Sequence, residues 1–226
     1  MQLNGTTKVL GIFGDPIAHS LSPKMQNAAI EAADINAVFV PFHVRKTELE
    51  AAVAAIRSLG LIGVNVTVPH KEAVMPFLDE IDTEAKLIGA VNTIVHLGGR
   101  LIGYNTDGRG FLSSLQSDLS FQPAGKNVLL LGAGGAARAA IVTLAQAATA
   151  RITISNRTYV KAKKLRDEFS GLFPDTEFVA VPFEAENLQP YLVSADLLVN
   201  TTVVGLHGED FSLPLIESLS PSAVFY

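Results

Sequence analysis

The chain has 226 residues, of which 48% are hydrophobic and 17% are charged, and its formal net charge is −5. An acidic balance without a long basic run argues against nucleic acid as a partner. The chain has no cysteine, which excludes disulfides, thiolate catalysis and cysteine-based zinc sites, and its five histidines show no metal-ligand spacing, so we expect no metal. The polar N-terminus lacks a signal-peptide pattern, and we expect a cytoplasmic protein with no membrane association.

Strand and helix patterns alternate in the first half of the chain, as in α/β layers. Ser22 is a good N-cap for the first helix, with Pro23 at its first helical position. A helical pattern that begins at Lys71 would place this lysine in a first turn, where the helix dipole disfavours a cation. The expected strands are 9–13, 38–44, 63–68, 91–96 and 101–104, and the expected helices are 22–33, 47–59, 71–81 and 83–87.

An expected linking helix over 107–119 and a Gln/Pro/Gly-containing loop separate this half from a second run of strands and helices. We therefore predict an α/β protein with a first domain at 1–107, a linking helix and loop at 108–126, and a second, doubly wound domain at 127–226. The expected strands of the second domain are 127–131, 151–155, 177–181, 196–200 and 223–226, and its expected helices are 135–148, 158–169 and one near 213–219.

The run Gly132-Ala133-Gly134-Gly135-Ala136-Ala137 follows an apolar strand and opens a Gly/Ala-rich helix, as in a dinucleotide-binding βαβ unit. Gly132 permits a sharp turn, and Gly134 lets the backbone approach a pyrophosphate at the helix N-terminus. The stretch from Val128 to Ala150 is apolar enough to resemble a membrane span, but a strand and a buried helix account for it.

The strand that follows this unit ends in a sequence that favours NADP over NAD. An NAD enzyme places an acidic side chain there, which would repel a 2′-phosphate. This chain instead has Asn156-Arg157-Thr158, in which Arg157 offers a planar fork for that phosphate and a stacking face for the adenine.

Four polar clusters lie at strand ends in the first half, where open sheets bind ligands. They offer hydroxyls, amides, one lysine and one aspartate, which suits a small polyhydroxylated ligand. The clusters are 16–22, 65–71, 89–93 and 103–107.

These motifs, in this order, resemble those of the shikimate dehydrogenase family. Pro16–Ser22 is similar to the family's substrate loop, Asn65–Lys71 to its lysine segment, and Asn105–Gly110 to its aspartate segment. The resemblance continues through Gly132–Arg138 and Asn156–Thr158, and it implies an N-terminal substrate domain, a Rossmann-type NADP domain, and reversible reduction of 3-dehydroshikimate to shikimate within aromatic amino-acid biosynthesis.

The resemblance also implies roles for individual residues. Lys71 and Asp107 would act at the reacting carbon–oxygen bond, with the proton-transferring member of the pair left open. Ser20 and Ser22 would bind the substrate carboxylate, and Asn65, Thr67, Asn92 and Asp107 its ring hydroxyls or keto group. The residues expected to bind the cofactor are Gly132, Ala133, Gly134, Gly135, Ala136, Asn156, Arg157, Thr158, Thr201 and Thr202.

Two alternatives remain open at this point: a quinate/shikimate dehydrogenase that uses NAD, and a non-catalytic protein that binds NADP or a metabolite. The family pattern continues beyond a strand such as 223–226, so we expect a chain that lacks a C-terminal segment, with reduced stability and turnover. We also expect a monomer or a homodimer.

Overall fold

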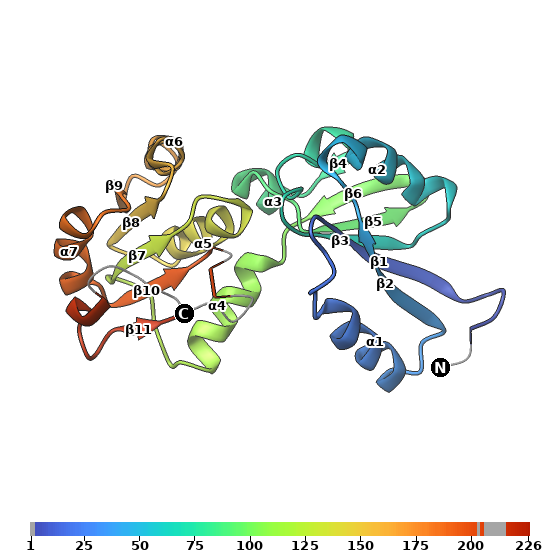
Figure 1. The fold of residues 1–226 in the computed structure, drawn as a ribbon, viewed down its shortest axis with the longest axis horizontal. Helices are drawn as coiled ribbons and strands as arrows, with labels where there is room; N and C mark the ends of the chain where they lie inside the picture. Colours follow the sequence, from blue (N-terminus) through green and yellow to red (C-terminus); the bar gives the residue numbers. More distant parts are fainter. Residues whose placement is uncertain (1–2, 203, 206–215) are drawn as a thin grey trace. The chain divides into compact units, whose positions relative to one another are not determined.

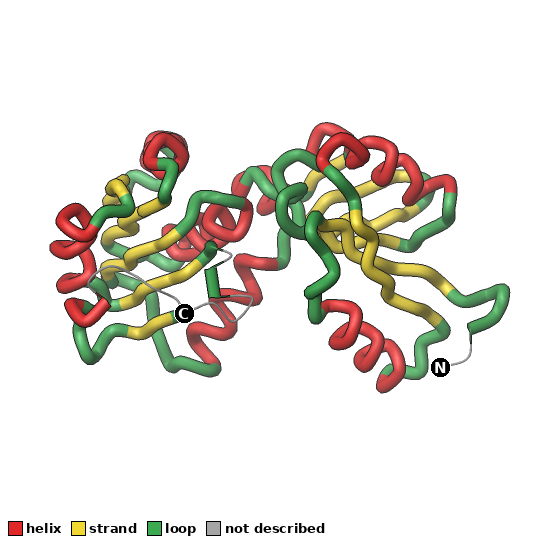
Figure 2. The backbone as a smooth tube through the Cα atoms, in the orientation of Figure 1, coloured by secondary structure: helices red, strands yellow, loops and turns green. Residues whose placement is uncertain are grey.

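The computed structural model describes residues 3–202, 204–205 and 216–226 of the chain. The chain divides into two compact units, Met1–Thr106 and Asp107–Tyr226. Each unit contains one sheet with helices beside it (Figures 1 and 2). The helices, strands and 3₁₀ helices of each unit confirm the expected α/β fold class.

The first unit is built on a mixed six-stranded sheet in the order β2-β1-β3-β5-β6-β4. Strands β1, β2 and β3 run parallel, whereas β5 pairs antiparallel with both β3 and β6. Its strands are β1 (Lys8–Gly14), β2 (Ala37–His43), β3 (Gly63–Val66), β4 (Glu80–Ile81), β5 (Thr93–Leu97) and β6 (Arg100–Tyr104), and its helices are α1 (Ser22–Ala32), α2 (Leu49–Ser58) and α3 (Thr83–Ile88).

Neighbouring residues of β1 point to opposite faces of this sheet, as the period of two in a strand requires. Ile12 packs with Ile30 of α1 in one core cluster, while Phe13 packs with Val53 and Ile56 of α2 in another. Helices α1 and α2 accordingly lie on opposite faces of the sheet (Figure 1). Burial of these apolar side chains supplies most of the stabilisation of the unit.

The prediction of a helix over residues 71–81 is wrong. After a turn, only a short 3₁₀ helix forms (Met75–Phe77), and β4 follows at a place where no strand was expected. Pro76 lacks the N–H that a continuing helix needs. The backbone N–H groups of Asp79 and Asp82 instead donate to carbonyls of β6, at Leu101 (3.0 Å) and Gly103 (2.9 Å), which draws the chain along the sheet edge.

A polar contact fixes this edge to α2. The carboxylate of Asp79 accepts hydrogen bonds from the backbone N–H of Leu101 (2.6 Å) and from Arg57 (2.5 Å). Both bonds favour the charged form and therefore lower the pKa of Asp79 below its ordinary value. The backbone bond from Leu101 is the largest cause, and the bond from the Arg57 guanidinium is the second.

The second unit is built on a parallel five-stranded sheet in the order β11-β10-β7-β8-β9. Its strands are β7 (Asn127–Leu131), β8 (Arg151–Asn156), β9 (Glu177–Pro182), β10 (Leu197–Asn200) and β11 (Val224–Phe225), and its helices are α4 (Asp107–Ser117), α5 (Gly135–Gln146), α6 (Tyr159–Ser170) and α7 (Ala185–Ser194). Strand order turns back after β9 to β10 on the other side of β7, as in doubly wound folds.

Right-handed crossovers place α5 and α6 on one face of this sheet and α7 on the other. Leu188 and Leu192 of α7 pack on Leu129 and Leu131 of β7. Buried Arg138 of α5 ion-pairs with Glu168 of α6, so its charge is compensated where it leaves water.

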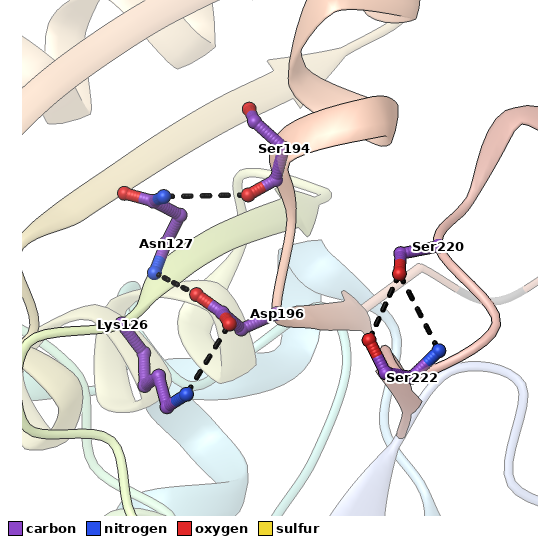
Figure 3. Close-up of polar contacts among 6 residues, drawn as sticks. All are labelled: Lys126, Asn127, Ser194, Asp196, Ser220 and Ser222. Carbon is purple, nitrogen blue, oxygen red and sulfur yellow. Dashed lines mark hydrogen bonds and ion pairs between the residues drawn. The ribbon is translucent and has the colours of Figure 1, made fainter.

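Asp196 connects the beginnings of the neighbouring strands β7 and β10 (Figure 3). Its carboxylate accepts from the backbone N–H of Asn127 (2.9 Å) and from the ammonium of Lys126 (3.3 Å). The start of β7 is thereby held beside the start of β10.

Helix α7 was not expected from the sequence, since Pro190 interrupts its pattern. The helix expected near 213–219 lies partly outside the described residues, and its described end is a short 3₁₀ helix, Ile216–Ser218. Within the described part of the chain, no helix is both long and apolar enough to cross a membrane.

Candidate active site

Four strand ends meet at one edge of the first sheet and bring the expected polar clusters together. Strand β1 pairs with β3 up to Phe13 and Val66, and the antiparallel course of β5 puts its first residue, Thr93, beside Asn65 and Tyr104. The ends of β1, β3 and β6 and the start of β5 therefore share this edge. We call it the polar edge.

Asn92 occupies the centre of the polar edge and is 8% exposed. Its Oδ1 accepts from the backbone N–H of Thr106 (3.0 Å) and from the hydroxyl of Thr93 (2.9 Å), and its Nδ2 donates to the Thr106 hydroxyl (3.0 Å). These bonds satisfy a buried amide and fix its orientation.

Asn65 is half-buried on β3 and is tied to the same group. Its Nδ2 donates to the hydroxyl of Thr93 (3.1 Å) and to the backbone carbonyl of Asn92 (3.3 Å). The amide is thus held by Thr93, the first residue of β5, and by Asn92, which directly precedes this strand.

The expected carboxylate anchor lies at the start of α1, but Ser22 is not the N-cap. The helix begins at Ser22 itself, after Leu21, and the hydroxyl of Ser20 accepts from the Ser22 backbone N–H at 3.3 Å. The expected capping role of Ser22 is therefore wrong, because the helix starts one residue earlier than expected, with Leu21 as its N-cap, and no side chain caps it. Both serines are half-buried, two residues apart, at this junction.

Thr67 and Lys71 belong to the turn that follows β3. The backbone N–H of Thr67 donates to Phe13 (2.9 Å), and the carbonyl of Lys71 accepts from Val91 (2.8 Å), next to Asn92. Buried His70, between them, makes a 2.6 Å hydrogen bond through Nε2 to the carbonyl of Val44. Lys71 is half-buried in a turn rather than in the first turn of a helix, so the helix-dipole argument for its function does not hold.

Asp107 is the first residue of α4 and of the second unit. It is half-buried, and the preceding residue, Thr106, is the one that Asn92 holds. The peptide bond between residues 106 and 107 therefore links the aspartate directly to the polar edge.

The glycine-rich turn of the second unit connects β7 to α5 in the way its sequence predicts. Gly132 has φ +112°, and a Cβ there would lie 2.3 Å from the hydroxyl oxygen of Thr201. At Gly134, the N-cap of α5, a Cβ would meet nothing within 4 Å. The turn thus needs glycine at 132 for its own geometry, while 134 leaves open the approach to the α5 N-terminus that a phosphate requires. Ala133, Gly135 and Ala136 complete the run, with Gly135 as the first residue of α5.

Thr201 and Thr202 follow β10 next to this turn. The Thr201 hydroxyl donates to the carbonyl of Leu131 (2.7 Å), and the Thr202 hydroxyl donates to Asn200 Oδ1 (2.7 Å). Both hydroxyl protons thus go to the protein, where they support the turn.

The three residues expected at the 2′-phosphate lie at the end of β8 and the start of α6. Asn156 Nδ2 donates to the carbonyl of Thr158 (3.0 Å), which closes a tight turn around Arg157. Arg157 and Thr158 are exposed. An exposed guanidinium at a βα turn suits an anionic ligand that arrives from solvent.

Thr93 and Thr106 lie within the expected polar clusters, but the sequence assigned neither of them the role that the structure shows, which is to hold the amides of Asn65 and Asn92. The available signal was their position, since each directly adjoins a candidate ligand in the sequence. Among the described residues, no group of three or more His, Asp or Glu side chains is placed to hold a metal ion.

A doubly wound sheet with a glycine turn at its first strand defines the second unit as a dinucleotide-binding domain, joined here to a mixed α/β domain with a polar edge. Two family models match these parts separately. The shikimate dehydrogenase substrate binding domain matches residues 12–94, and the shikimate / quinate 5-dehydrogenase model matches residues 115–205.

Individual relatives agree with the family models. A shikimate dehydrogenase (NADP(+)) of Geobacter metallireducens is 49% identical over all 226 residues, which cover 79% of its own length. A crystal structure of a shikimate dehydrogenase with NADP+ has a TM-score of 0.87 and 37% identity. The match covers 99% of this chain and 77% of the chain in that crystal structure. The structure of the Thermus thermophilus enzyme with NADP(H) and shikimate has a TM-score of 0.83 and 33% identity. The match covers 97% of this chain and 77% of the Thermus chain.

The chain belongs to the shikimate dehydrogenase family. The expected family and the expected pairing of an N-terminal substrate domain with a Rossmann-type domain are therefore confirmed.

Proposed function

We propose that this chain catalyses the NADP-dependent, reversible reduction of 3-dehydroshikimate to shikimate. Family membership supports this reaction, since the curated relatives are shikimate dehydrogenases (NADP(+)). The observation that carries the proposal is the polar edge, where hydroxyls and amides from separate segments form one connected group.

The ligand has a carboxylate at one end and a ring with several hydroxyls. Ser20 and Ser22, two residues apart at the start of α1, present two hydroxyls beside a helix N-terminus, which suits the carboxylate. Asn65, Thr67 and Asn92 are our candidates for the ring hydroxyls, because short polar groups on a fixed backbone select hydroxyl patterns.

We assign the reacting carbon–oxygen bond to Lys71 and Asp107. As a coupled pair, one of them gives a proton to the ketone oxygen during reduction, and the lysine cation stabilises negative charge that develops there. In the oxidation of shikimate the same proton leaves the hydroxyl for the pair.

The residues of the second unit fit a phosphorylated dinucleotide. NADP, when bound, supplies the hydride chemistry, and the protein supplies placement. The α5 N-terminus behind Gly134 would hold the pyrophosphate, and Arg157, flanked by Asn156 and Thr158, would hold the 2′-phosphate. We also propose that the protein acts in the cytoplasm as a monomer or a homodimer.

Steady-state oxidation of shikimate, followed by the absorbance of the reduced nicotinamide, tests this function. Assays with NADP and with NAD, and with shikimate and with quinate, cover the NAD-using alternative. Turnover with shikimate and NADP at the highest kcat/KM supports the proposal. Turnover with NAD and quinate at a higher kcat/KM would contradict the proposal and indicate a quinate/shikimate dehydrogenase that uses NAD. NADP binding without any turnover would favour a non-catalytic binding role.

A further inference from the structure

Three side chains of the polar edge form a hydrogen-bonded relay whose direction is set by the backbone. The relay runs from Thr106 through Asn92 and Thr93 to Asn65. Each of these residues belongs to the first unit.

The relay starts at a group with only one possible role. The backbone N–H of Thr106 can only donate, so the Asn92 atom 3.0 Å from it is the amide oxygen. The Thr93 hydroxyl lies 2.9 Å from the same oxygen and therefore donates its single proton to it.

With its proton committed, Thr93 can only accept from Asn65. The Asn65 atom 3.1 Å from the Thr93 oxygen must then be the NH₂ group, which also lies 3.3 Å from the backbone carbonyl of Asn92, an acceptor. Two independent acceptors thus hold the same end of the Asn65 amide.

The other end of this amide, Oδ1, receives no hydrogen bond from the described residues. Asn65 is half-buried at the polar edge, so this oxygen is an acceptor of fixed direction. Its partner has to be a donor, such as a hydroxyl, because a ketone or an ether offers only lone pairs.

We propose that Thr93 is a positioning residue that makes Asn65 a hydroxyl-selective acceptor for one ring hydroxyl of the substrate. The assignment rests on the proposed function for the identity of the ligand. It adds a residue that touches no substrate but determines which end of Asn65 faces it, and hence which substituent the site accepts.

Thr93→Val tests this directly, because valine keeps the branched shape on β5 and removes the hydroxyl. The loss of one neutral hydrogen bond predicts a dissociation constant for shikimate about threefold to tenfold higher by titration calorimetry of the full chain. Thr93→Ser retains the hydroxyl, and its affinity should stay within about twofold of the parent.

A matched control lies in the second unit. Thr149 is buried, and its hydroxyl has no hydrogen-bond partner among the described residues. Thr149→Val removes the same atoms outside the relay, and its affinity for shikimate should equal that of the parent. Thermal melting of all the variants separates a general loss of stability from a loss of binding.

Monodeoxy analogues of shikimate identify the contacted hydroxyl. One analogue should bind the parent and Thr93→Val equally, because the donor that Asn65 accepts from is already missing. Unchanged shikimate affinity in Thr93→Val, or a loss that is the same for every analogue, would overturn the assignment of Thr93. A parent chain that binds NADP but no shikimate would instead overturn the proposed function.

Discussion

The two sheet edges that carry the candidate site are built in opposite ways. At the polar edge of the first unit, the amides of Asn65 and Asn92 are bound to other side chains and to backbone before any ligand arrives. At the corresponding edge of the second unit, the candidate cofactor-binding groups are the backbone of a glycine turn and the exposed side chain of Arg157.

This difference matches the ligands that we assign to the two edges. A hydroxylated ring is recognised by the direction of individual hydrogen bonds, which requires fixed donors and acceptors. Phosphates are recognised by charge and by N–H groups at a helix end, which tolerate looser placement of side chains. The first edge should therefore set substrate identity, and the second should set cofactor identity.

The largest effect should come from Lys71→Ala. If this lysine serves at the reacting bond, kcat falls about a hundredfold to ten-thousandfold while the affinity for shikimate changes much less. Steady-state kinetics measure this, with exposed Lys86 of α3, replaced by alanine, as the control. A kcat within a few-fold of the parent would remove Lys71 from the chemistry.

Substitutions in the glycine turn should separate folding from cofactor binding. Gly132→Ala places a Cβ against Thr201 at a positive φ and should destabilise the second unit by about 3 kcal/mol. Gly134→Ala meets no protein atom, so the melting temperature should hold while NADP affinity falls, because the added methyl faces the phosphate approach. Equal melting temperatures of these two variants would contradict this division of roles.

Arg157→Ala should weaken NADP by about 1.5–3 kcal/mol, the value of a charge-assisted hydrogen bond, and leave NAD almost unchanged. Calorimetric titration with both cofactors checks this difference. Lys163→Ala, on the same helix, controls for the loss of one positive charge. An equal loss of affinity for NADP and NAD would place Arg157 outside the 2′-phosphate site.

Ser22→Ala sharpens the comparison on the substrate side. The KM for shikimate should rise about threefold to tenfold with little change in kcat, as for lost uniform binding. Since Ser22 does not cap α1, the melting temperature should stay at the parental value. An unchanged KM together with a lower melting temperature would leave this serine with a structural role only.

The smallest effect concerns the Arg57–Asp79 contact and pH. Because the folded-state pKa of Asp79 is lowered, its contribution to stability is present above the unfolded-state pKa of about 4 and is lost as the pH falls through the folded-state pKa. Melting curves of the parent and Asp79→Asn should therefore differ at neutral pH and converge in acid. A stability difference that persists unchanged in strong acid would contradict this linkage.

The second unit was easier to predict than the first because its signals are local. The turn that follows β7 needs glycine at one position and open space at another, and both are visible in the spacing. Helix α7 was not predicted because Pro190 lies inside it. Its formation depends instead on the packing of Leu188 and Leu192 on the sheet.

The first unit depends on contacts between distant segments. The region after Lys71 has helical spacing, yet hydrogen bonds from residues 79 and 82 to β6 and the position of Pro76 turn it into a 3₁₀ helix and an edge strand. The candidate ligands were identified by residue type, but the roles of Thr93 and Thr106 emerge only when β3, β5 and β6 are paired.

The most direct test of the division between the two edges is a double-mutant cycle on the kinetics of shikimate oxidation with Thr93→Val and Arg157→Ala. The account predicts that Thr93→Val changes the KM for shikimate alone, that Arg157→Ala changes the KM for NADP alone, and that the two effects add in the double variant. A Thr93→Val variant that loses NADP affinity, or an Arg157→Ala variant that loses shikimate affinity to the same extent, would contradict it.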